Sequence, residues 1–160
     1  MTKRLRTALQ RGTVAPSAEH ELQRVTAATT YQTGWLAYDA GQQDAARHWW
    51  LEACHLANLT EIPEAHVAAL ATMALQASDG PARGREVVEL AQRARTVAHT
   101  GNATPTVLSV LAAREAVGHA MSGDRGAATS AMSEARRQLD HGRSADDPLW
   151  VGFWTPADLA

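Results

Sequence analysis

The chain has 160 residues, 45% of them hydrophobic but only 5% aromatic, and its formal net charge is −2. This length is enough for a domain with its own core, and the near-neutral charge gives no electrostatic reason to expect direct nucleic-acid binding. Cys54 is the lone cysteine, which excludes an intramolecular disulfide. No apolar run approaches the roughly 20 residues of a membrane span, and the basic start lacks the apolar segment of a secretion signal. We therefore expect a cytoplasmic protein with no membrane partner.

Helix signals follow one another along the chain, and its alanine-rich composition favours closely packed helices. Residues 3–11 predict a short amphipathic helix that ends at Gly12. Ser17 can cap the next helix, which runs until Gly41 stops it. Thr104-Pro105 combines an N-cap with a proline at the first helical position, which is a strong start signal. The other predicted helices cover residues 43–58, 64–78, 84–99 and 125–140, and the helix that begins at Thr104-Pro105 runs to about residue 122.

The segment 146–160 is an aromatic tail. Pro148 ends the last helix, and Trp150, Phe153 and Trp154 follow within a few residues. A stack of helices leaves an apolar face at its end that needs covering, so capping the last helix pair is one interpretation. The other is a homodimer interface, because exposed aromatic side chains form interaction surfaces.

Small and aromatic residues recur at a fixed step of 41. Ala53, Ala94 and Ala135 are related by this step. The same step relates Trp50 to Ala91 and Met132, Ala46 to Val87 and Ala128, and Gly41 to Ala82 and Gly123. A constant period of this size is typical of stacked helical repeats. We therefore predict one all-α domain over residues 1–160, with helix pairs at about 17–58, 64–99 and 104–140.

Within the first pair, each residue of the pattern has a structural task. Gly34 lets the two helices approach closely, and Gly41 takes the backbone through the tight turn. Ala46 and Ala53 leave room for the first helix, and Trp50 fills the gap between the helices.

This register resembles the tetratricopeptide repeat. The residues that carry the resemblance in the first pair are Gly34, Gly41, Asp44, Ala46, Trp50 and Ala53. The third pair matches at Gly123, Ala128 and Ala135, with Ala116 and Met132 in the places of Gly34 and Trp50. The second pair departs from the pattern, because Leu75 and Ala82 stand where the glycines are expected, and the step of 41 exceeds the family's 34. The resemblance implies a right-handed α-solenoid with a concave face.

A narrower resemblance concerns the C-terminal repeat region of actinobacterial helix-turn-helix transcriptional regulators. It is carried by the stretches 34–42, 75–79 and 148–160. In those regulators a DNA-binding domain precedes the repeats, and this chain resembles a detached sensor or interaction module without it. The resemblance implies a regulatory role and no direct nucleic-acid contact.

The tetratricopeptide resemblance implies that the first helix of each pair lines the concave groove. In the first pair the groove positions are Tyr31, Trp35, Tyr38 and Asp39, and the aromatic residues share one stripe of the helix. In the second pair they are Thr72, Gln76 and Asp79. These seven residues are the predicted ligand-binding set, suited to a peptide, a partner protein or a small effector. The alternative is that the aromatic side chains pack on the N-terminal helix as core.

Three other histidine or cysteine features carry weaker hypotheses. His48, Glu52 and His55 share one face of a helix, but the register turns that face outward, so we predict a solvated surface and no metal site. His119 is either a buried, hydrogen-bonded histidine or a titrating groove residue. Cys54 is predicted to be an inert small apolar residue.

The sequence favours a non-enzymatic binding module, because it has no phosphate-binding loop, zinc pattern or nucleophile elbow, and we assign it no catalytic residue, metal or cofactor. The alternative is a small enzyme that uses the same groove, with Asp39, Asp79 and His119 as its acid–base groups. A homodimer paired through the tail aromatic residues is the third hypothesis.

Overall fold

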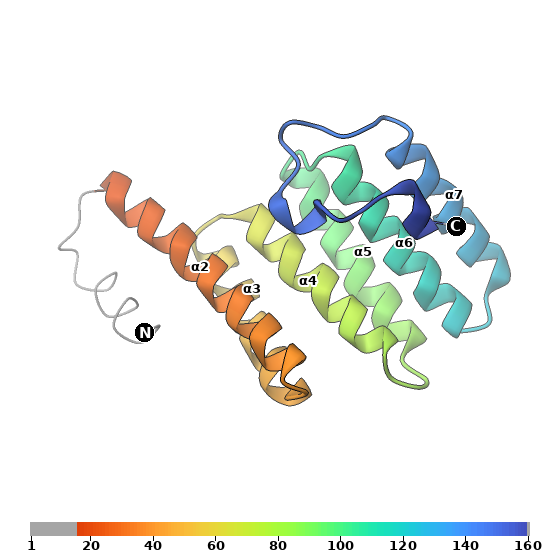
Figure 1. Cartoon of the computed structure of the whole chain (residues 1–160), viewed down its shortest axis with the longest axis horizontal. Coiled ribbons are helices and arrows are strands. Elements are labelled where there is room, and N and C mark those ends of the chain that lie inside the picture. Colours follow the sequence, from red (N-terminus) through yellow and green to blue (C-terminus); the bar gives the residue numbers. More distant parts are fainter. Residues whose placement is uncertain (1–15, 160) are drawn as a thin grey trace. The chain divides into compact units, whose positions relative to one another are not determined.

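The computed structural model describes residues 16–159, so the helix predicted at 3–11 lies outside the described part. The described residues form six α-helices and two short 3₁₀-helices and contain no strand, which confirms the all-α class. The helices are labelled in Figure 1. Their bounds are α2 Pro16–Asp39, α3 Gln43–Leu59, α4 Pro63–Ser78, α5 Gly84–Thr100, α6 Pro105–Met121, α7 Arg125–Leu139, η1 Leu149–Val151 and η2 Pro156–Leu159.

The predicted boundaries hold to within one or two residues, but the cap predicted at Ser17 is wrong, because α2 already begins at Pro16 and contains Ser17. The Thr104 side chain accepts a hydrogen bond from the Val107 backbone N–H at the start of α6. Asp124 does the same for the Ala127 N–H at the start of α7, at 2.9 Å. Each cap satisfies one of the N–H groups that the first helical turn leaves without a partner inside the helix.

The chain divides into two compact units, the first ending at Ala69 and the second beginning at Leu70, with α4 running through the boundary. No helix of the described part combines the length and apolar character that crossing a membrane requires.

In the first unit α2 packs on α3. The contact is closest at Gly34, where an added Cβ atom would lie 2.3 Å from Nε1 of Trp50. Trp50 is fully buried, and so are Ala46 and Ala53 on either side of it along α3. The close approach at Gly34 and the filling role of Trp50 are therefore confirmed, because only a residue without a side chain leaves room for the indole ring.

In the second unit α6 packs on both α5 and α7, and the tail folds back over this group (Figure 1). The segment η1 contacts α6 and η2 contacts α7. The central position of α6 explains its largely buried, apolar sequence, because a helix covered on several sides has no wide polar face.

The step of 41 residues appears in the backbone itself. Gly41, Ala82 and Gly123 adopt the left-handed conformation, with φ of 75°, 61° and 78°. Each precedes a helix by two residues, and those helices begin at Gln43, Gly84 and Arg125. Ala82 therefore occupies the turn position that the other two repeats give to glycine, although a Cβ atom makes that conformation costly.

Candidate functional site

The predicted aromatic stripe on α2 belongs to one cluster of rings in the first unit. Trp35 contacts Tyr31 at a centroid distance of 6.5 Å and Tyr38 at 5.6 Å, both edge to face. Trp35 and Tyr38 also meet Trp50 of α3, at 5.6 Å and 5.8 Å. Edge-to-face pairs of this kind add about 0.5–1.5 kcal/mol beyond burial, so the cluster fixes the rings against one another.

The members of the stripe differ in exposure. Tyr31 is buried, and its backbone carbonyl accepts a hydrogen bond from Nε1 of Trp50 at 3.3 Å. Trp35 and Tyr38 are half-buried, and Asp39 at the end of α2 is exposed. Tyr31 thus contributes mainly to the core between α2 and α3, while Trp35, Tyr38 and Asp39 retain surface that a ligand can reach.

The other predicted binding residues belong to the second unit. Thr72 and Gln76 lie on α4 and are largely buried, whereas Asp79 directly follows α4 and is exposed. Asp79 is therefore the most accessible of the three predicted positions on this unit.

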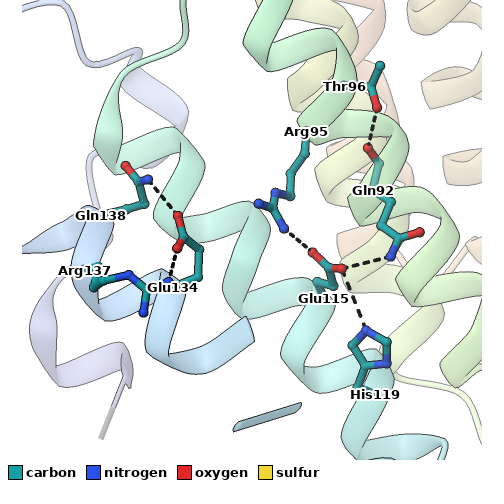
Figure 2. A network of polar contacts seen from close by, with 8 residues as sticks. All are labelled: Gln92, Arg95, Thr96, Glu115, His119, Glu134, Arg137 and Gln138. Carbon is teal, nitrogen blue, oxygen red and sulfur yellow. Dashed lines mark hydrogen bonds and ion pairs between the residues drawn. The ribbon is translucent and has the colours of Figure 1, made fainter. Parts of the chain in front are cut away.

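A pocket that the sequence did not predict opens in the second unit among α5, α6 and α7. It has a volume of about 280 Å³. Its lining comes from Arg95 on α5, Glu115 and His119 on α6, and Ala127, Ser130, Ala131, Glu134 and Arg137 on α7. Figure 2 shows the lining residues Arg95, Glu115, His119, Glu134 and Arg137, with Arg95 between the two carboxylates.

Glu115 is the most deeply placed charge of this pocket, with only 10% of its side chain exposed. Its Oε2 accepts a hydrogen bond from Arg95 at 2.5 Å, and its Oε1 accepts one from Nε2 of Gln92 at 2.9 Å. Nε2 of His119 lies 3.7 Å from the same Oε1. Burial alone raises the pKa of Glu115, but the hydrogen bonds from Gln92 and Arg95 and the neighbouring positive charges outweigh it, so the pKa lies below its ordinary value.

The second carboxylate of the pocket is held in a similar way. Oε1 of Glu134 accepts a hydrogen bond from Gln138 at 2.8 Å, and Oε2 accepts one from Arg137. These two hydrogen bonds hold the pKa of Glu134 below its ordinary value, with smaller contributions from the charges of Arg137 and Arg95 that outweigh the effect of burial. Both carboxylates are therefore ionised, and each of their oxygens already accepts a hydrogen bond. This suits them to positioning the arginines and not to transferring protons.

The sequence analysis identified only His119 among the titratable residues of this pocket. Glu115 could have pointed to the pocket, because it is the single acid in the apolar stretch 105–121 and a buried carboxylate needs a hydrogen-bonding partner. Its partners are 20 and 23 residues away in the sequence, so no spacing within one helix reveals them.

The hypothesis of a small enzyme assigned acid–base roles to Asp39, Asp79 and His119. Asp39 belongs to the first unit, and the other two belong to the second. His119 lines the pocket beside Glu115, and Asp79 is not among the lining residues. The histidine thus faces a carboxylate that the sequence did not select.

His48 and His55 are exposed on α3, and Glu52 is half-buried. In the described range 16–159, no three His, Cys, Asp or Glu side chains are grouped so that they could hold a metal ion. Cys54, next to them on α3, is partly exposed.

The aromatic residues of the tail were predicted either to cap the last helix pair or to form a homodimer interface, and they differ in burial. Trp154 is buried, and its Nε1 donates a hydrogen bond to Oγ of Ser109 at 3.0 Å. Ser109 in turn donates to the Ala135 carbonyl at 2.8 Å, which ties the tail to both α6 and α7. Phe153 points outward with 60% of its surface exposed, and Leu149 is 99% exposed. Capping is therefore confirmed for Trp154, and Leu149 and Phe153 remain as free apolar surface.

Comparisons of this chain with protein families, with curated proteins and with solved structures find no match.

Proposed function

We propose that this chain is a non-enzymatic interaction module with a regulatory role in the cytoplasm. Its helix pairs form a tetratricopeptide-like, right-handed α-solenoid of about three repeats. It binds a peptide segment of a partner protein through α2, where Trp35 and Tyr38 are the apolar anchors and Asp39 is the polar contact. Thr72, Gln76 and Asp79 remain predicted binding residues.

The observation that carries this proposal is the exposed side of the aromatic cluster. Trp35 and Tyr38 are half-exposed, yet their rings are held by contacts with each other and with Trp50. Aromatic side chains fixed in this way lose little conformational entropy on binding, so more of the burial energy appears as affinity. A carboxylate one residue beyond Tyr38 adds a directional contact for a basic or N–H group.

The charged pocket of the second unit supports a binding role over the enzyme alternative. Both of its carboxylates accept hydrogen bonds at each oxygen, and their pKa values are lowered. A general acid or base near neutral pH needs the opposite shift, because its pKa must approach the working pH.

The test begins with a peptide selected from a random phage-displayed library on the immobilised full chain. Calorimetry then compares binding of the synthetic peptide to Trp35→Leu, Asp39→Asn and the control Leu36→Ala. Leu36 lies beside Trp35 but is 71% exposed and takes no part in the ring contacts. We expect Trp35→Leu to weaken binding by about tenfold or more, as truncation of a buried aromatic anchor does.

Parallel unfolding curves separate a binding role from a structural one. Leucine keeps part of the contact with Trp50, so Trp35→Leu should remain folded at the temperature of the assay. Peptide affinity that is unchanged in both Trp35→Leu and Asp39→Asn contradicts the assignment of the site to α2.

A homodimer is the second candidate, favoured by the exposure of Leu149 and Phe153. Deleting the tail would also uncover the Trp154 contact with α6, so a double substitution to serine at the two exposed residues is the cleaner test. Light scattering decides: a dimer that dissociates in the double variant supports this candidate, and a monomeric native chain excludes it.

A further inference from the structure

The pocket among α5, α6 and α7 contains hydrogen-bond donors that are not used within the described part of the chain. Each carboxylate oxygen of Glu115 and Glu134 already accepts a hydrogen bond. Arg95 uses NH1 alone for its bond to Glu115, and Arg137 uses NH2 alone for its bond to Glu134. Within residues 16–159, the remaining guanidinium nitrogens of both arginines and the hydroxyl of Ser130 have no hydrogen-bond partner. The unused guanidinium N–H groups can only donate, and the Ser130 hydroxyl can donate as well, whereas each carboxylate oxygen already accepts one hydrogen bond. A ligand that offers hydrogen-bond acceptors can therefore satisfy the unused donors of this pocket.

The charge of the pocket restricts which acceptor-rich ligand it can take. The two arginines and the two glutamates cancel, and His119 adds a positive charge when it is protonated. A dianion brought between Glu115 and Glu134 would be repelled by both carboxylates. Because the arginine and glutamate charges cancel, a second negative charge on the ligand gains no net attraction but makes the ligand more costly to desolvate. A singly charged anion avoids that cost and still receives the charge-assisted hydrogen bonds of the arginines.

The volume of the pocket sets the size of the group that can enter it. Ala127 and Ala131 line the α7 side with short side chains, which creates the hollow. A volume of about 280 Å³ corresponds to roughly nine water molecules at ~30 Å³ each. This is room for a molecule with a few carbon atoms and one carboxylate.

We propose that this pocket binds a small, singly charged oxyanion, the carboxylate of a metabolite-sized acid, which Arg95, Arg137 and Ser130 hold by hydrogen bonds. Glu115 and Gln92 position Arg95, and Glu134 positions Arg137. The site shares no residue with the peptide surface proposed on α2, so either proposal can fail without the other.

The test is an NMR titration of the full chain with sodium acetate at constant ionic strength, with methylammonium chloride and inorganic phosphate as comparison probes. The observed signals are the His119 imidazole and the methyl groups of Ala127 and Ala131, which line the pocket. We expect saturable shifts with acetate in the millimolar range, because so small a ligand gains little binding free energy. Methylammonium should give no saturable shift, and phosphate should bind more weakly than acetate.

Three variants locate the site. Arg137→Gln removes donors from a residue that is 66% exposed, and we expect about tenfold weaker acetate binding. Ser130→Ala removes an exposed hydroxyl and should weaken binding by a smaller factor. Arg93→Gln is the matched control, since it removes the same charge from an exposed position of α5 that does not line the pocket.

Four results would overturn the proposal: an absence of saturable shifts with acetate, binding of methylammonium, phosphate that binds as tightly as acetate, or equal effects of Arg137→Gln and Arg93→Gln. An acetylated tetra-alanine peptide with a free C-terminus is the last probe. If it binds much more tightly than acetate at these same signals, the ligand is a chain terminus and not a small acid, which also contradicts the proposal.

Discussion

Ala82 offers the sharpest test of the repeat, because it adopts the conformation of a turn glycine with φ of 61°. A Cβ atom in the left-handed region costs about 1–2 kcal/mol. Glycine removes that cost but adds about 0.4–1 kcal/mol of conformational freedom to the unfolded chain. We therefore expect Ala82→Gly to raise the free energy of unfolding by about 0.5–1 kcal/mol.

The reverse substitution is available at the equivalent position of the third repeat. Gly123 has φ of 78°, and an added Cβ atom would have no neighbour within 4 Å. Gly123→Ala should thus lose stability through conformation alone, by a similar amount and with the opposite sign. Ala45→Gly is the control, because Ala45 has a helical backbone in the first turn of α3, where glycine loses up to about 1 kcal/mol relative to alanine.

Urea unfolding of the full chain, followed by far-ultraviolet circular dichroism, measures all three variants at one temperature. We expect Ala82→Gly to stabilise the folded chain and Ala45→Gly to destabilise it. If Ala82→Gly is as destabilising as Ala45→Gly, then position 82 is not a left-handed turn, and the correspondence of the three turns fails.

Two further predictions concern packing and pH. Gly34→Ala places a Cβ atom against the Trp50 indole, so we expect a loss of about 1–3 kcal/mol in urea unfolding, whereas Gly126→Ala, with only one atom at 3.6 Å, should be neutral or stabilising. The pKa of Glu115 is lowered by its partners, so its contribution to stability is present above the ordinary carboxyl pKa of about 4 and is lost as the pH falls through the lowered native value. Urea midpoints measured across this acid range should fall less steeply for Glu115→Gln than for the native chain, and parallel curves would contradict the pairing.

Local signals explain why the helices were predictable from the sequence. Thr104-Pro105 starts α6 and Gly41 separates α2 from α3, as expected, because capping and turn chemistry act over three or four residues. The contact of Gly34 with Trp50 was also predictable, since the two residues belong to the same helix pair and to one recurring pattern.

The pocket could not be predicted from the sequence, because it depends on contacts between helices and not on local signals. Glu115 is joined to Gln92 and Arg95 across two helices, and this pairing depends on how α5 packs on α6. The close packing at Gly84 was missed in the same way. A Cβ atom there would lie 2.6 Å from the Gly118 carbonyl oxygen, a contact between positions that the 41-residue step does not relate.

If the half-exposed aromatic residues of α2 bind a peptide ligand, the indole N–H signals of the tryptophans report that binding most directly. The Trp35 signal is assigned by its loss in Trp35→Leu, and the selected peptide is then titrated into the native chain. We predict a saturable shift of the Trp35 signal with the affinity found by calorimetry, and a smaller shift of the buried Trp154 signal. Peptide binding that leaves the Trp35 signal unchanged would contradict the claim.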